Sequence, residues 1–203
     1  MLKVYGATQS RAFRVLWMLE ELAVEYEHVP ISPRETRTES YLAINPNGHV
    51  PTLVDGDLTI VESMAVNLYL ADRYDGDGAR GLWPQSPAGR GLAYQWSFWA
   101  MQETEAHLLT ALFNRVLAPE EKRDEAKAVE ACKRLEAPMR VLDGALTGRA
   151  YLATDAFSVA DLNVAAVLSW SRGAGLDLAP HANVARWYGE CFGRAARKAA
   201  SRK

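Results

Sequence analysis

The hydrophobic pattern of the chain changes once, within residues 75–87, and this change constrains the fold more than any other feature. Residues 1–77 alternate short apolar runs with segments of helical period, whereas residues 88–200 have an almost purely helical period. The stretch between them is rich in glycine and proline, as linkers are. With 203 residues the chain is long enough for two small domains. We therefore predict a first domain at residues 1–77, a linker at 78–87 and an all-helical domain at 88–203.

In the first domain, turn and strand signals predict the element order β-α-β-α-β-β-α. Asp55-Gly56 is a strong two-residue hairpin signal, so the two strands that flank it pair antiparallel. The first two strands are separated by a helix, which forms a crossover between them. In that helix Arg11, Arg14 and Glu21 are predicted to lie off the apolar face. The predicted strands are residues 2–5, 26–31, 52–54 and 58–61, and the predicted helices begin at Ser10, near Ser40 and at Glu62.

The second domain is predicted from helix start and stop signals. A long helix is expected at about residues 90–117. Pro119 suits the first turn of the next helix, and Pro138 is expected to kink it. Ser158-Val-Ala-Asp161 has the form of a capping box, in which two side chains satisfy the first free N–H groups of a helix. We therefore assign Ser158 and Asp161 to helix capping and not to catalysis.

The C-terminal end of the chain is strongly basic. A last helix is predicted at about residues 183–198, and no acid follows Glu190. Removing the five cations of this end from the formal net charge of −2 leaves about −7 for the rest of the chain. Because an acidic body repels phosphate, we interpret this end as a fraying helix terminus whose cations complement the helix dipole, and not as a nucleic-acid tail. The five cations are Arg194, Arg197, Lys198, Arg202 and Lys203.

Cysteine, histidine and hydropathy patterns argue against several classes of function. Cys132 and Cys191 lie far apart without a CxxC spacing, and no pair of the four histidines is spaced i, i+4, so we expect no metal site. No apolar stretch approaches the roughly 18 residues that a membrane helix needs. Arg11 and Arg14 interrupt the N-terminal apolar segment before it resembles a signal peptide. We expect a cytoplasmic protein with neither a membrane nor a nucleic acid as partner.

Three short features of the first domain have the residue types for chemistry. Ser10, between the first strand and the first helix, is either a helix N-cap or a hydroxyl donor where the helix dipole favours negative charge. Val50-Pro51 opens a strand, and a cis bond there, against the trans default, would expose the Val50 main chain to an extended peptide. Glu62-Ser63 is either a helix-start signal or a receptor for the ammonium and carboxylate of an amino acid. All three are predicted at one end of the sheet and suit a short peptide with a zwitterionic end.

The order of these features along the chain resembles the cytosolic glutathione transferases, of the bacterial type with an active-site serine. Each motif alone is weak, but their order is specific and the resemblance covers nearly the whole chain. It implies a thioredoxin-like domain followed by an all-helical bundle domain, usually as a homodimer. It also implies glutathione as cosubstrate, with no covalently bound cofactor. The matching stretches are LKVYGATQS at 2–10, NPNGHVPTL at 45–53, VESMA at 61–65 and YLATDAFSVAD at 151–161.

The resemblance assigns Ser10 to the hydroxyl that stabilises the glutathione thiolate, a role that Thr8 or a bound water could share. Val50 would pair its main chain with the cysteine of glutathione, helped by a cis Pro51. A free cysteine thiol has a pKa near 8.5, and lowering it by about two units requires roughly 2.7 kcal/mol. A hydroxyl hydrogen bond to a charged sulfur supplies about 1.5–3 kcal/mol and the helix dipole about 0.3–1 kcal/mol. A dedicated base is therefore not required.

The resemblance also implies contacts to both ends of glutathione. Glu62 and Ser63 would bind the γ-glutamyl group. His49 stands where the family often has Gln or Lys, and it would reach the glycine end. Arg37, in the preceding loop, is a candidate for the glycine carboxylate.

The pocket for the second substrate is expected to be hydrophobic and contributed by the helical domain. Trp99 and Gln102, near the start of the long helix, are candidates, and Phe13 and Trp170 are further ones. The alternative is that the aromatic residues of this helix form interdomain and helix–helix core, and we favour it for the cluster as a whole.

The leading hypothesis is a detoxifying transferase that conjugates glutathione to small hydrophobic electrophiles. One alternative is a glutathione-dependent reductase of disulfides or peroxides, or an isomerase. The absence of a cysteine near Ser10 argues only against a mixed disulfide on the protein itself. Another alternative is a non-catalytic interaction module, which the retention of Val50-Pro51 and Glu62-Ser63 beside Ser10 disfavours.

Overall fold

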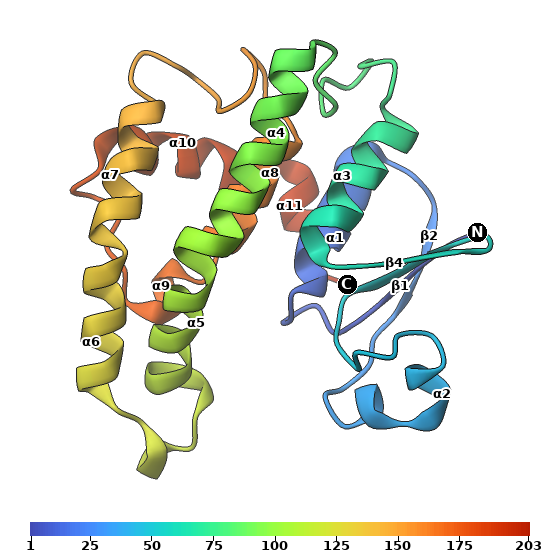
Figure 1. Ribbon diagram of the computed structural model, residues 1–203, viewed down its shortest axis with the longest axis horizontal. Coiled ribbons are helices and arrows are strands. Elements are labelled where there is room, and N and C mark those ends of the chain that lie inside the picture. Colours follow the sequence, from blue (N-terminus) through green and yellow to red (C-terminus); the bar gives the residue numbers. More distant parts are fainter. The chain divides into compact units, whose positions relative to one another are not determined.

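The chain forms two compact units in a computed structural model that describes residues 1–203. The first unit comprises Met1–Gln85 together with Gly193–Lys203, and the second comprises Ser86–Phe192. Figure 1 shows that the strands all belong to the first unit, whereas the second unit is helical. The division differs from the predicted one at the C-terminal end, because residues 193–203 pack on the first unit instead of extending the helical domain.

A four-stranded mixed sheet in the order β2-β1-β3-β4 forms the base of the first unit. β1 (Leu2–Tyr5) pairs parallel with β2 (Tyr26–Val29) and antiparallel with β3 (Thr52–Asp55). β3 continues through the predicted hairpin into β4 (Leu58–Val61). The predicted order β-α-β-α-β-β-α and the α/β fold class are therefore confirmed.

Two helices, α1 (Ala12–Leu22) and α3 (Ser63–Tyr74), pack side by side on the sheet (Figure 1). The short elements η1 (Glu35–Arg37) and α2 (Glu39–Leu42) occupy the connection between β2 and β3. The core between helices and sheet is aliphatic, and its fully buried members include Val4, Val15, Leu16, Leu19, Leu53, Val66 and Leu70.

The prediction that Arg14 and Glu21 lie off the buried face of α1 is wrong. Arg14 is 1% exposed, and the side chain of Glu21 is 6% exposed. The cause is that α1 contacts α3 and also α11 (Ala195–Ala200), so that little of its circumference remains for solvent. A helix enclosed in this way buries polar side chains as well as apolar ones, provided that they are hydrogen-bonded.

Asp55, at the end of β3, ties the hairpin to α3. The hydroxyls of Tyr69 and Tyr74 both donate to its Oδ2 atom, at 2.8 Å each. Burial, the largest single influence, would raise the pKa of Asp55, but these two hydrogen bonds and nearby positive charge, including Arg73, together outweigh it, and the pKa lies below its ordinary value. Burial, together with the bond to Asp55, raises the pKa of Tyr74 to about 12.

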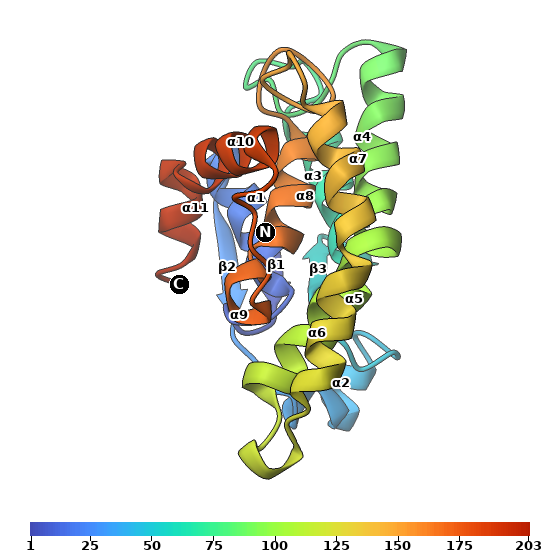
Figure 2. The same cartoon turned by 90° about the vertical axis from the view of Figure 1, so that its left-hand side faces the viewer.

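The basic C-terminal end lies along α1 (Figure 2). Arg194 donates from Nε and Nη2 to the two carboxylate oxygens of Glu21, at 2.6 and 2.7 Å. Lys203 Nζ is 3.1 Å from Glu20, and the Arg197 guanidinium lies 5.9 Å from the centre of the Phe13 ring. The predicted fraying terminus is therefore wrong, because acids and an aromatic ring of α1 bind these cations.

The second unit begins with a long helical rod, predicted as one helix over residues 90–117. It contains two π-helical segments, η2 and η3, so that the backbone hydrogen bonding changes twice along its length. Next along the chain, the helix expected from Pro119 is instead a 3-10 turn followed by two helices that meet at Leu135. Pro138 lacks an N–H to donate to residue 134, which accounts for a break at this point. The elements are α4 (Pro87–Trp99), η2 (Ala100–Glu105), α5 (Ala106–Leu112), η3 (Phe113–Leu117), η4 (Glu120–Lys122), α6 (Glu125–Arg134) and α7 (Glu136–Ala145).

Helix α8 (Val159–Leu168) forms the centre of the second unit, and every one of its residues is buried. The predicted capping box at its start is confirmed, with Ser158 and Asp161 bonded to each other's backbone N–H groups. Asp161 also accepts from Leu152 N and from Trp187 Nε1, at 2.9 Å each. Burial raises the pKa of Asp161 despite these bonds.

The remaining helices of this unit are α9 (Ser171–Ala174) and α10 (Ala182–Phe192), which leads into the C-terminal segment. None of the helices in the structure has the length and apolar character required to cross a membrane.

We expect the Arg194–Glu21 pair to contribute to the stability of the first unit. Arg194→Met should lower the free energy of unfolding by about 1–3 kcal/mol, because the buried Glu21 carboxylate then keeps only weaker partners such as Trp17 Nε1. Lys198→Met, on the same helix at an exposed position, is the control and should change it by less than about 0.5 kcal/mol. Urea unfolding measures both, and equal stabilities for the two variants would contradict the role of the pair.

Candidate functional site

The three predicted features meet at one end of the sheet. Strand register places Tyr5 opposite Thr52 and Thr52 opposite Val61, so the end of β1, the start of β3 and the end of β4 are neighbours. Gly6 follows β1 at this end and has a φ of +133°. A Cβ atom on Gly6 would lie 2.7 Å from Ala12 Cβ and 2.9 Å from Val50 Cβ, which is closer than side-chain atoms approach.

Ser10 lies in the turn just before α1, which begins at Ala12. Its Oγ atom accepts a hydrogen bond from Ala12 N–H at 3.1 Å and donates one to the Ala7 carbonyl at 2.6 Å. The same carbonyl accepts the Ser10 N–H at 2.9 Å. If the hydroxyl turns away toward a ligand, the Ala7 oxygen therefore still has a donor. The hydroxyl of Thr8 has a different partner, the main-chain carbonyl of Lys203 at 2.9 Å.

The peptide bond between Val50 and Pro51 is cis, as predicted. Val50 precedes the first ladder pair of β3, and neither its N–H nor its C=O forms a hydrogen bond with another residue of the chain. Both groups are therefore available to an extended segment that lies alongside, in the way that one strand pairs with another.

Glu62 and Ser63 join β4 to α3 in an unusual backbone conformation. Glu62 has a φ of +68° and a ψ of +112°, and it is one of two residues other than glycine with a positive φ. Its side chain is exposed, whereas Ser63, at the first position of α3, is 3% exposed. The Ser63 Oγ atom accepts a hydrogen bond from Arg14 Nη1 at 3.2 Å. The exposed Glu62 carboxylate therefore lies next to the uncapped N-terminus of α3 and the Ser63 hydroxyl.

The loop before Val50 is held from inside and carries two exposed basic side chains. The carbonyl of His49 accepts hydrogen bonds from Tyr41 Oη at 2.7 Å and from Asn45 Nδ2 at 2.8 Å, which leaves the imidazole exposed. Arg37 is exposed too, and its Nη1 atom donates to the Asn47 carbonyl at 3.5 Å. His49 and Arg37 thus both belong to the outside of this loop.

The residues predicted for a second substrate are divided between the two units. In the first unit Phe13 is partly buried on α1, with its ring centre 6.0 Å from that of Trp17. In the second unit Trp99 packs edge-on against Trp96, at 5.1 Å between ring centres, and Gln102 is exposed on η2. Their shared pocket stays a prediction.

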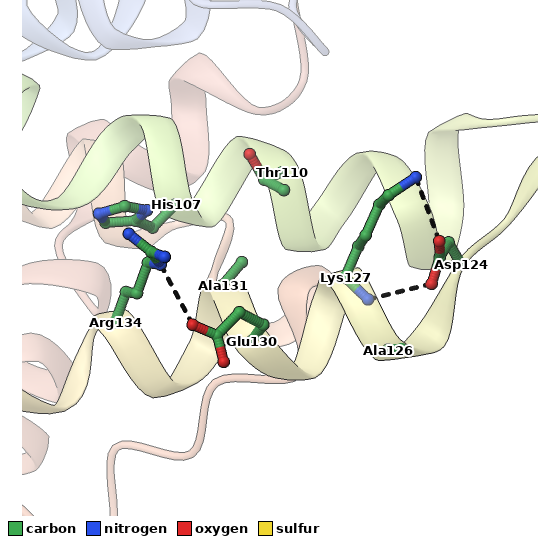
Figure 3. A pocket seen from close by; sticks show the side chains of 8 residues that line it. All are labelled: His107, Thr110, Asp124, Ala126, Lys127, Glu130, Ala131 and Arg134. Atoms are coloured by element: carbon green, nitrogen blue, oxygen red, sulfur yellow. Dashed lines mark hydrogen bonds and ion pairs between the residues drawn. The ribbon is translucent and has the colours of Figure 1, made fainter.

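The helical unit has a separate hollow of about 530 Å³ between α5 and α6 (Figure 3). Two ion pairs line it, Lys127 to Asp124 at 3.2 Å and Arg134 to Glu130 at 3.3 Å. Lys127 and Arg134 are therefore each paired with a carboxylate three or four residues earlier in the chain. These two ion pairs add no net charge to the hollow. Its lining residues are His107, Thr110, Asp124, Ala126, Lys127, Glu130, Ala131 and Arg134.

Residues that no sequence pattern marks as functional support the site from behind. Arg14 was assigned to the polar side of its helix, yet it lies under Ser63. Its contact with Ser63 joins residues 49 positions apart, and no local pattern signals it. Tyr41 and Asn45, which hold the His49 carbonyl, likewise have no signal in the sequence.

Comparisons with known proteins point in one direction. Residues 1–72 match the family described as "Glutathione S-transferase, N-terminal domain", and residues 104–195 match its C-terminal domain. The chain is 36% identical over 194 residues to glutathione S-transferase GstB of Escherichia coli K12. The aligned region covers 93% of this chain and 91% of the relative.

Solved structures give the same result for the fold. A theta class glutathione S-transferase from Xanthomonas axonopodis pv. citri, with glutathione bound, has a TM-score of 0.90 and 28% identity, covering 100% of this chain and 97% of the other. Glutathione S-transferase-I bound with lactoylglutathione has a TM-score of 0.87 and 28% identity, covering 99% and 98% of the two chains.

The positive φ of Glu62 predicts that the backbone at this position is strained and lowers the stability of the protein. Glu62→Gly should raise the free energy of unfolding by about 1 kcal/mol, because glycine adopts a positive φ without the steric cost that a side chain imposes. Thermal and urea unfolding measure the change, with Glu62→Ala as the control that removes the carboxylate but keeps Cβ. A Glu62→Gly protein no more stable than Glu62→Ala would contradict backbone strain at this position.

Proposed function

The chain belongs to the glutathione S-transferase family and is a glutathione S-transferase, and we propose that it conjugates the glutathione thiolate to small hydrophobic electrophiles, with Ser10 stabilising the thiolate. The observation that carries the proposal is the hydrogen bonding of Ser10, whose hydroxyl is free to turn without leaving a carbonyl unsatisfied. A neutral bond to the Ala7 carbonyl is then exchanged for a charge-assisted bond to sulfur, which is the stronger of the two.

The Ala12 N–H supports the same role. It donates to Ser10 Oγ and so withdraws electron density from the oxygen, which makes the hydroxyl a better donor. Ser10 also lies at the N-terminal end of α1, where the helix dipole favours an anion. Together these effects offset the roughly 2.7 kcal/mol required to lower a thiol pKa by about two units.

Glutathione would lie extended along the start of β3. Its cysteine would pair with the free N–H and C=O of Val50, which holds the sulfur near Ser10. The γ-glutamyl carboxylate would bind at Ser63 and the N-terminus of α3, and Glu62 would take the ammonium. His49 and Arg37, on the outside of the preceding loop, would contact the glycine carboxylate.

The reaction itself is a nucleophilic substitution or addition. The thiol proton leaves to solvent, and the thiolate forms a C–S bond to the electrophilic carbon. In a substitution the leaving group departs with its bonding electrons. In an addition the π bond of the electrophile breaks, and the atom that receives its electron pair takes a proton from solvent. The protein contributes binding, orientation and a stabilised thiolate, and Phe13, Trp99 and Gln102 would contact the hydrophobic part of the electrophile. Homodimer formation stays a prediction.

Ser10→Ala tests the role of the hydroxyl. We expect kcat/KM with a generic aryl halide to fall by about tenfold or more, because one charge-assisted hydrogen bond to the sulfur is lost. The acid limb of the pH profile should move to higher pH, since the bound thiol then ionises less readily.

Thr8→Val is the matched control, because its hydroxyl donates to Lys203 and not toward the sheet end. It should keep kcat/KM within about twofold and leave the pH profile in place. If Thr8→Val loses the activity and Ser10→Ala keeps it, the assignment to Ser10 is overturned in favour of Thr8. Unchanged activity in both would point to a bound water.

A further inference from the structure

Arg14 is a buried arginine beneath Ser63, and arginine is seldom fully buried. It is 1% exposed on α1, and its Nη1 atom donates to Ser63 Oγ at 3.2 Å. Its main chain is also held, because the Arg14 carbonyl accepts a hydrogen bond from Asn67 Nδ2 of α3 at 3.2 Å. Arg14 therefore connects the helix that follows Ser10 with the helix that begins at Ser63.

The direction of this hydrogen bond decides what Ser63 can do. A serine hydroxyl has one proton to donate and two lone pairs to accept, whereas a guanidinium has only donors. Ser63 must therefore be the acceptor, and its own proton points elsewhere. No group of the chain accepts that proton. The hydroxyl is thus oriented as a donor, which is the polarity that a carboxylate requires.

We propose that Arg14 is a positioning residue that orients the Ser63 hydroxyl as a donor to the α-carboxylate of the γ-glutamyl group. The inference rests on the proposed function, because it takes that carboxylate as the ligand of Ser63. Arg14 itself touches no substrate atom. Its contribution is specific to one group of the ligand, the carboxylate, and leaves the ammonium to Glu62.

Two analogues of glutathione separate these contributions. 4-Aminobutanoyl-Cys-Gly lacks the α-carboxylate, and glutaryl-Cys-Gly lacks the α-ammonium. Dissociation constants for glutathione and both analogues are measured by calorimetry for the wild type, Arg14→Met and Arg14→Lys. Met removes every donor, whereas Lys keeps a cation but is one bond too short to reach the Nη1 position. Met18→Ala, at a fully buried position of the same helix, controls for destabilisation alone.

The wild type should prefer glutathione over 4-aminobutanoyl-Cys-Gly by about tenfold or more, because the analogue has no carboxylate to accept the charge-assisted hydrogen bond from Ser63. In Arg14→Met this preference should fall to about threefold or less, while the preference over glutaryl-Cys-Gly stays within about twofold of the wild type. KM for glutathione should rise with little change in kcat. Met18→Ala should keep both preferences.

Two results would overturn the inference, and they are distinguishable. If the wild type prefers glutathione over the carboxylate-free analogue and both Arg14 variants keep that preference, Arg14 does not orient Ser63 but the proposed γ-glutamyl site stands. If the wild type shows no such preference, the proposed site fails and the inference fails with it. If Arg14→Met does not fold, Arg14→Lys provides the test. An Arg14→Lys protein that prefers glutathione over 4-aminobutanoyl-Cys-Gly as strongly as the wild type would overturn the inference.

Discussion

The site depends on how closely the end of β1 approaches its neighbours. Gly6 packs between Val50 and Ala12 with no room for a Cβ atom, so that the loop before β3 and the start of α1 are both drawn against one point of the sheet. Antiparallel pairing of β1 with β3, and of β3 with β4, then brings Glu62 and Ser63 to the same end. A side chain at position 6 would push Val50 and the start of α1 apart, and so would separate the groups that we propose to bind one short peptide.

Around that point the chain offers groups of different polarity in a fixed order. A hydroxyl whose proton can be redirected lies at the start of α1, an unpaired peptide unit lies beside a cis proline, and a carboxylate and a hydroxyl lie at the start of α3. In the proposed binding mode, this order matches the sulfur, the cysteine main chain and the γ-glutamyl group of glutathione. The proposed reaction uses no nucleophilic side chain of the protein, because the ligand carries the sulfur nucleophile. The buried Arg14 connects two of these positions from below.

Local signals predicted much of this arrangement. The Asp55-Gly56 hairpin, the strand–helix alternation and the capping box at Ser158 are each encoded within a few residues, and the structure has all three. The cis bond before Pro51 is different, because the local pattern favours trans and only the family resemblance implies cis. What local reasoning could not supply were contacts distant in sequence. Arg14 and Glu21 are buried because α3 and α11 enclose α1, and Arg194 binds an acid that precedes it by most of the chain. An argument from hydrophobic periodicity assigns such charged residues to the exposed face of their helix.

If this end of the sheet stabilises the thiolate of bound glutathione, as we propose, the pKa of the glutathione thiol must fall on binding. The ultraviolet absorbance of the thiolate is titrated against pH for glutathione bound to the wild-type protein, with the protein alone as reference. We expect a midpoint about two units below the ordinary value near 8.5. A midpoint at that ordinary value, with glutathione bound, would contradict it.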